Sequence, residues 1–125
     1  GDVGTLSRQL NKGITFTASQ RLERLLFAAL IGESSGDTTL ARKNYKILAT
    51  YNPYFEEGII AAANFFRNQD NSGIKAYSIL AEAIQINSNS IRLLRAYAAE
   101  ATRQGFDEYA SNAVQRLRDL EDALR

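Results

Sequence analysis

The chain has 125 residues, enough for one domain with a buried core; 45% of them are apolar and 23% are charged. It contains no Cys and no His, which excludes the commonest zinc ligands and most nucleophile–base pairs, so we expect neither an enzyme nor a cofactor. The net charge of +1 gives no general attraction to nucleic acid, and no apolar run reaches the roughly 20 residues that a membrane-spanning helix needs, so we expect neither a nucleic-acid partner nor membrane insertion.

Residues 1–17 are predicted to form an irregular N-terminal arm. Leu6, Leu10 and Ile14 recur every four residues, as on one or two helical turns, but Gly13 and the β-branched residues after it oppose a longer helix. A loosely docked arm and the remnant of a preceding helix both fit this pattern, and we favour the arm. Because the chain starts with Gly and lacks Met, we expect it to be part of a longer protein.

The first three predicted helices have recognisable ends. A capping box from Thr17 to Gln20 starts the first helix, which ends within residues 32–36, where two glycines and two serines interrupt the pattern. Asp37 or a neighbouring Thr caps the second helix. Pro53 suits the first turn of the third helix, with Asn52 as its cap.

Three more helices are predicted over residues 74–86, over 91–103 and from about 107 onward, separated by polar turns. Apolar residues at helical spacing define the faces that we expect to be buried. In the second helix this face consists of Leu40, Ala41, Tyr45, Ile47 and Leu48. In the last helix it consists of Tyr109, Ala110, Ala113, Val114, Leu117 and Leu120.

The helices form three hairpins with matching small residues. Ala41, Ala76 and Ala110 lie 35 and 34 residues apart. Other residues repeat with nearly the same period, which indicates a repeat protein rather than a plain six-helix bundle. The matching sets are Ala29, Ala63 and Ala98 in the first helices, and Leu48, Ala83 and Leu117 in the second helices. Gly36 lies five residues before Ala41, and Gly105 lies five residues before Ala110.

This period and these small residues resemble the tetratricopeptide repeat, over about residues 18–120. The characteristic Trp of that family is absent, and Leu25, Ile59 and Leu94 stand in its place. The resemblance implies an all-α, right-handed α-α superhelix of about three hairpins, with repeats at about 18–52, 53–87 and 88–122 of a domain covering 18–125. It also implies a bacterial multi-repeat protein.

In the tetratricopeptide family the first helix of each repeat lines a concave groove that binds peptides. The resemblance places in this groove Leu26, Leu30, Glu57, Ile60, Asn64, Arg67, Arg92, Arg95 and Arg103. We expect a scaffold that binds a protein or peptide, with Arg92, Arg95 and Arg103 bracketing an acidic group or a C-terminus. Two alternatives stay open: the arginines pair with Glu100 or nearby acids on a solvated face, or the chain is a structural spacer that self-associates through its ends.

Overall fold

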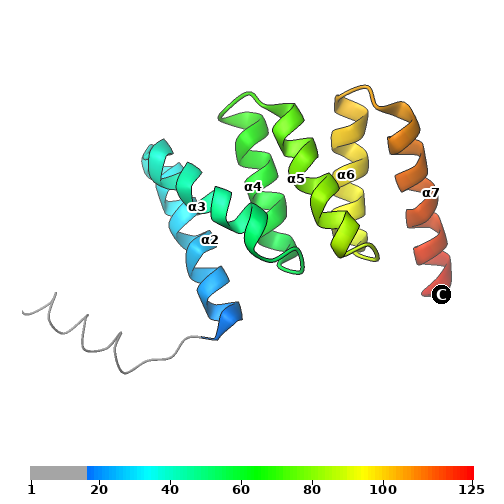
Figure 1. Cartoon of the computed structure of the whole chain (residues 1–125), viewed down its shortest axis with the longest axis horizontal. Coiled ribbons are helices and arrows are strands. Elements are labelled where there is room, and N and C mark those ends of the chain that lie inside the picture. The colour runs from blue at the N-terminus through cyan, green and yellow to red at the C-terminus, as the bar shows by residue number, and fades with distance from the viewer. Residues whose placement is uncertain (1–16) are drawn as a thin grey trace, which may run out of the picture.

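The computed structural model describes residues 17–125, so the predicted N-terminal arm lies outside it except for Thr17. This part of the chain holds six α-helices and no strand. They are α2 (Ala18–Ser35), α3 (Thr38–Tyr51), α4 (Glu56–Asn68), α5 (Gly73–Ile86), α6 (Ile91–Arg103) and α7 (Asp107–Ala123). Consecutive helices lie side by side in a row (Figure 1). The predicted fold class is confirmed: the protein is an all-α array of three helical hairpins, α2–α3, α4–α5 and α6–α7.

The hairpins are arranged in two layers. Each helix packs against the next in the chain, and α2 also contacts α4, as α4 contacts α6. The first helices of the hairpins therefore form one layer, and the second helices α3, α5 and α7 form the other. None of the helices in residues 17–125 is long and apolar enough to cross a membrane.

Side-chain caps fix where four of the helices begin. Thr17 and Gln20 form the predicted capping box of α2, with backbone-to-side-chain distances of 2.9 and 3.1 Å. Asp37 caps α3 as predicted, and Ser72 and Ser90 cap α5 and α6 in the same way. Each cap satisfies a backbone N–H that has no partner inside the helix.

The start of α4 differs from the prediction. The helix begins at Glu56 rather than at Pro53, and Phe55 occupies the cap position without a side-chain hydrogen bond. Asn52 instead ends α3, and its side chain accepts a hydrogen bond from the Tyr54 backbone N–H at 2.8 Å. Asn52 therefore stabilises the turn containing Pro53, because a bond to the residue two positions on favours a turn over a helix.

The end of α2 falls within the predicted residues 32–36, and Gly32 lies inside the helix. A Cβ atom at this position would lie 2.9 Å from the backbone nitrogen of Ala41 and 3.1 Å from the carbonyl oxygen of Asp37. Gly32 is therefore a point of close approach between α2 and the first turn of α3. The helix ends at Ser35, and Gly36 follows in the left-handed conformation.

One backbone feature recurs in all three hairpins. Gly36, Asn71 and Gly105 have φ values of +83°, +50° and +78°, and they are the residues with positive φ in the described part of the chain. Each lies in the turn between the two helices of its hairpin, five residues before Ala41, Ala76 or Ala110. The repeat seen in the sequence is thus also a repeat of backbone conformation.

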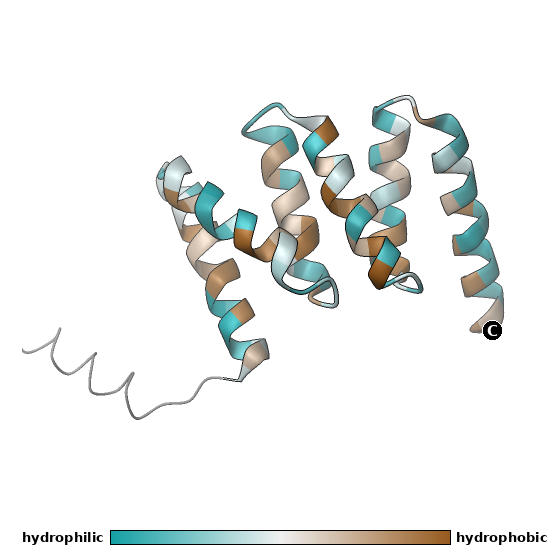
Figure 2. Cartoon of the chain, in the orientation of Figure 1, coloured by the Kyte–Doolittle hydropathy of each residue, from teal (hydrophilic) through white to brown (hydrophobic). Residues whose placement is uncertain are grey.

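The small residues that define the repeat are buried between helices. Ala41 and Ala76 have no exposed surface, and Ala110 is 8% exposed. The other two matching sets are buried as well: Ala29, Ala63, Ala98, Leu48, Ala83 and Leu117. Figure 2 shows the resulting pattern of hydrophobic bands, interrupted by hydrophilic ones, along every helix.

Four residues that we expected to be buried are exposed instead. Leu40 and Ile47 of α3 are 39% and 36% exposed, and Tyr109 and Val114 of α7 are 57% and 39% exposed. The reason is that these helices bury a narrow stripe, and the four residues lie on its flanks. The buried stripe of α3 is Ala41, Asn44, Tyr45 and Leu48, and that of α7 is Ala110, Ala113 and Leu117.

Candidate partner-binding groove

The predicted groove residues lie on the layer formed by α2, α4 and α6. Most of them are accessible to a partner. Leu30 is 43% exposed, and the exposed or half-buried residues on the other two helices are Glu57, Ile60, Asn64, Arg67, Arg92, Arg95 and Arg103.

Leu26 is the exception, and its prediction as a groove residue is wrong. It is 6% exposed and belongs to the core together with Leu22 and Ala29. These residues are three and four positions apart, so they form one helical stripe that faces the rest of the array. The predicted register put Leu26 on the groove side of α2, whereas Leu26 lies on the side that faces the core.

The structure joins Asn64, Arg67 and Arg103 around one carboxylate. Nη1 of Arg67 on α4 donates a hydrogen bond to Oε1 of Glu100 on α6, and Nη2 donates to Asn64 Oδ1 at 2.7 Å. Nη1 of Arg103 donates to the same Glu100 oxygen at 3.0 Å. This cluster, which we call the Glu100 cluster, links two hairpins by charge-assisted hydrogen bonds.

Glu100 is buried, which the sequence analysis missed. Its side chain has no exposed surface, and its Oε2 atom has no hydrogen-bond partner within the described residues. The repeat contained the signal: the buried positions of α6 are those of α4 shifted by 35 residues, and this shift places Glu100 on Phe65. A carboxylate at a core position needs cationic partners, and two arginines meet that need.

Arg92 and Arg95 do not join this cluster. Nη2 of Arg95 donates to Oε1 of Glu121 on α7 at 2.8 Å. Arg92 is exposed, and no ion pair to it is found within residues 17–125. The three arginines therefore do not converge on a single anion, and for Arg95 and Arg103 the structure supports the alternative that they pair with nearby acids.

The interface between the first two hairpins has an aromatic residue, Phe65, at the position equivalent to Glu100. Tyr45 of α3 stacks on Phe65 of α4, with ring centroids 4.8 Å apart. The Tyr45 hydroxyl donates to Glu33 Oε1 at 2.7 Å, and burial, followed by this hydrogen bond, raises the pKa of Tyr45 above its usual range. The hydroxyl thus stays protonated as a donor. The second interface also contains an aromatic pair, Tyr77 of α5 and Tyr97 of α6, with ring centroids 5.3 Å apart.

The charges on this surface favour anions at its α4–α6 end. Glu100 offsets one of the two arginines in its cluster, which leaves a net positive charge there, and the side chain of Arg103 is 50% exposed. Arg92 lies eleven residues before Arg103 on α6, about 16 Å along the helix axis. Exposed guanidinium groups at this spacing can contact carboxylates at two points of an extended chain.

These features define the class of the protein: an α-α array of helical hairpins with a basic end on one layer. The chain matches no protein-family model, and no curated protein is significantly similar to it. The relation to the tetratricopeptide family therefore stays a prediction based on the period and the small residues.

Proposed function

We propose that the protein is a non-enzymatic, tetratricopeptide-like interaction module that binds an acidic peptide, or an acidic segment of another protein, along the surface of α2, α4 and α6. The observation that supports this most is the Glu100 cluster. Two arginines from different helices converge there, and Arg103 still exposes half of its side chain.

The rest of the surface fits a peptide ligand. Ile60 on α4 is half-buried and Leu30 on α2 is exposed, so the surface offers apolar contacts in addition to its basic end. Asn64 is exposed and supplies an amide group near the cluster. A peptide with a carboxylate near one end and an apolar residue further along would match these groups.

Arg92 is the best position for a test of this proposal. It is exposed and has no ion pair in the described part of the chain, so Arg92→Glu changes the charge of the surface with little effect on folding. Arg95 is less suitable, because a Glu there would face Glu121. Lys43→Glu on α3 is the matched control, since Lys43 is exposed on the other layer and undergoes the same change of charge.

The experiment is a selection of short peptides from a displayed library with the parent chain as bait. We expect the selected peptides to be enriched in Asp, Glu or a free C-terminal carboxylate. Arg92→Glu should weaken their binding roughly tenfold, or about 1.4 kcal/mol, and Lys43→Glu should leave it unchanged. If the selected peptides bind the parent, Arg92→Glu and Lys43→Glu equally, the proposal that a basic groove binds them is refuted.

A structural spacer is the second candidate, and one observation favours it. Phe27 and Ile31 expose 66% and 48% of their surface on α2, at one end of the array. Apolar end faces of repeat arrays stack on further repeats. Sedimentation at increasing protein concentration would reveal such self-association, and a spacer without ligand would also select no peptide.

A further inference from the structure

The layer of second helices has an aromatic hollow between α5 and α7. The hollow has a volume of about 490 Å³, and its lining includes four aromatic residues: Tyr77 of α5, Tyr97 of α6, and Phe106 and Tyr109 at the start of α7. Tyr97 is 7% exposed and Tyr109 is 57% exposed, so Tyr97 forms the base of the hollow and Tyr109 its rim. We call this site the aromatic hollow.

The rings of the aromatic hollow meet edge to face. The centroids of Tyr77 and Phe106 are 4.9 Å apart with an interplanar angle of 70°, and those of Phe106 and Tyr109 are 6.5 Å apart at 81°. An edge-to-face contact covers only one face of one of its two rings. Ring faces, which carry the negative part of the aromatic quadrupole, therefore remain uncovered by the other rings of the site.

Hydroxyl oxygens lie among these rings. The hydroxyls of Tyr77 and Tyr97 are 3.1 Å apart and share a hydrogen bond. Burial, followed by this hydrogen bond, raises the pKa of Tyr97 above its usual range, so its hydroxyl stays neutral. The oxygen of the hydroxyl that donates in this pair keeps its lone pairs, with which it can accept a hydrogen bond from a ligand.

The preceding interface has an equivalent hollow between α3 and α5. Its volume is about 400 Å³, and the residues of α3 that line it are Lys46, Ala49 and Thr50. The repeat shift of 35 residues aligns them with three residues of α5 that line the aromatic hollow, namely Ala81, Ile84 and Gln85. The two hollows are thus the same site in successive hairpins.

The hollow between α3 and α5 contains cations of the chain itself. Besides Lys46, it is lined by Lys75 of α5, whose Nζ atom lies 4.2 Å from the centroid of the Phe66 ring. This distance is that of a cation–π contact. In the aromatic hollow, the equivalents of the two lysines are Ala81 and Tyr109, and none of the described residues that line it is charged. The aromatic hollow therefore has more rings than its counterpart but no cation of its own.

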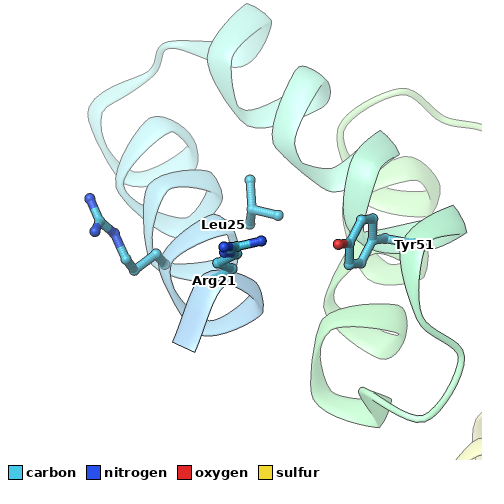
Figure 3. A pocket seen from close by; sticks show the side chains of 4 residues that line it. Arg21, Leu25 and Tyr51 are labelled. Atoms are coloured by element: carbon cyan, nitrogen blue, oxygen red, sulfur yellow. The ribbon is translucent and has the colours of Figure 1, made fainter. Parts of the chain in front are cut away.

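The hollow between α2 and the end of α3 also contains its own cations. It is lined by Leu25 and Tyr51, and in addition by Arg21 and Arg24. Figure 3 shows Leu25 and Arg21 of α2 directed toward the Tyr51 ring. Of these three hollows, only the aromatic hollow combines several rings with an uncharged lining among the described residues.

We propose that the aromatic hollow binds the alkylammonium group of a lysine side chain from a partner protein. The negative ring faces attract a cation, and the phenolic oxygens accept hydrogen bonds from its N–H groups. An anion would meet the same ring faces with no positive group to compensate for them.

The nearest charges on α7 agree with a cationic ligand. Asp107 and Glu108, which follow Phe106, are exposed, and no ion pair to either is found within residues 17–125. Unpaired carboxylates raise the local concentration of cations. The aromatic hollow lies on the layer opposite to the proposed peptide groove, so the two proposals are independent of each other.

NMR titration of the isotope-labelled full chain tests this proposal, with N-acetyl-lysine methylamide as the probe. N-acetyl-norleucine methylamide is the neutral comparison, because it has the same alkyl chain without the ammonium group. The test variant is Tyr109→Lys, which introduces the lysine of the preceding hollow and so places a cation of the chain itself at the site. Tyr54→Lys is the matched control, since Tyr54 is 64% exposed in the turn between α3 and α4 and is not among the residues that line the hollow. The amide spectrum also shows whether each variant is folded.

We expect the lysine probe to shift the backbone amide signals of Tyr77, Phe106 and Tyr109 saturably, with a dissociation constant in the millimolar range. The norleucine probe should bind roughly threefold more weakly, since it lacks the cation–π contact. Tyr109→Lys should weaken binding of the lysine probe roughly tenfold through repulsion between like charges, and Tyr54→Lys should bind it as the parent does.

Equal binding of the two probes would overturn the proposal and make the hollow a site for apolar side chains. Unchanged binding by Tyr109→Lys would overturn it as well, because the cation would then bind elsewhere. The same conclusion would follow if the lysine probe caused no saturable shift of these three signals in the parent.

Discussion

Arg67 on α4 and Glu100 on α6 form an ion pair that bridges two hairpins. The carboxylate has no exposed surface, whereas the side chain of Arg67 is 23% exposed. In the preceding hairpin the position of Glu100 is occupied by Phe65, so at this one position a charged contact stands in place of an aromatic one.

Removing Arg67 should destabilise the protein strongly. Arg67→Met leaves Glu100 buried with Arg103 as its remaining charged partner, and a buried charge that loses a partner costs about 3 kcal/mol. The free energy of unfolding, from urea denaturation followed by circular dichroism, measures this loss.

The double variant Arg67→Met/Glu100→Leu separates the two contributions. Because the equivalent position in α4 holds an apolar residue, we expect Leu to be accommodated and the double variant to recover most of the lost stability. A double variant as unstable as the single one would contradict the assignment of the loss to the buried charge.

Ala76 tests the close packing of the second hairpin. It has no exposed surface on α5, so Ala76→Leu should overpack the contact between helices and lower the free energy of unfolding by about 1–3 kcal/mol. Ala99→Leu is the control, because Ala99 is exposed on α6 and the larger side chain has room there. If both variants unfold at the same denaturant concentration as the parent, the repeat register is wrong.

Much of the fold could be predicted because local rules determine it. The bounds of α6 coincide with the prediction, since Ser90 caps its start and Gly105 adopts the left-handed conformation after its end. The prediction was wrong at Asn52, where a cap and a turn are equally compatible with the residue type. The predicted burial of Ile47 was also wrong. Ile47 lies at the flank of its helix, where burial depends on how wide a surface the neighbouring helix covers.

Less of the candidate site could be predicted. Helical spacing places Arg92, Arg95 and Arg103 on related turns, but the partner of Arg95 comes from another helix, because Arg95 pairs with Glu121, 26 residues away. Such distant pairs depend on how helices pack against one another, which periodicity within one helix does not describe. The burial of Glu100 could have been predicted from the repeat alone, because the repeat aligns Glu100 with Phe65.

Asn71 should respond to substitution as a left-handed residue. Its φ of +50° matches the turn position of Gly36 and Gly105. Asn71→Gly should therefore change the free energy of unfolding little or raise it slightly, whereas Asn71→Val should lower it by about 1–2 kcal/mol, because a β-branched residue is strained in this conformation. Thermal or urea unfolding of the two variants decides this, and a Val variant as stable as the Gly variant would argue against the left-handed turn.

Arg42 and Asp70 should make part of the stability depend on pH. Nε and Nη2 of Arg42 on α3 donate to the two carboxylate oxygens of Asp70, at 2.9 and 2.6 Å, and these hydrogen bonds hold the pKa of Asp70 below its usual value. A lowered pKa in the folded state means that the ionised carboxylate stabilises the fold above the unfolded pKa of about 3.9, and that this contribution is lost as the pH falls through the folded value. Arg42→Met should flatten this acid-dependent loss in urea titrations between neutral and strongly acidic pH, while Lys43→Met, at the neighbouring exposed position, should keep the slope of the parent. Identical slopes for the parent and Arg42→Met would show that the pair does not contribute.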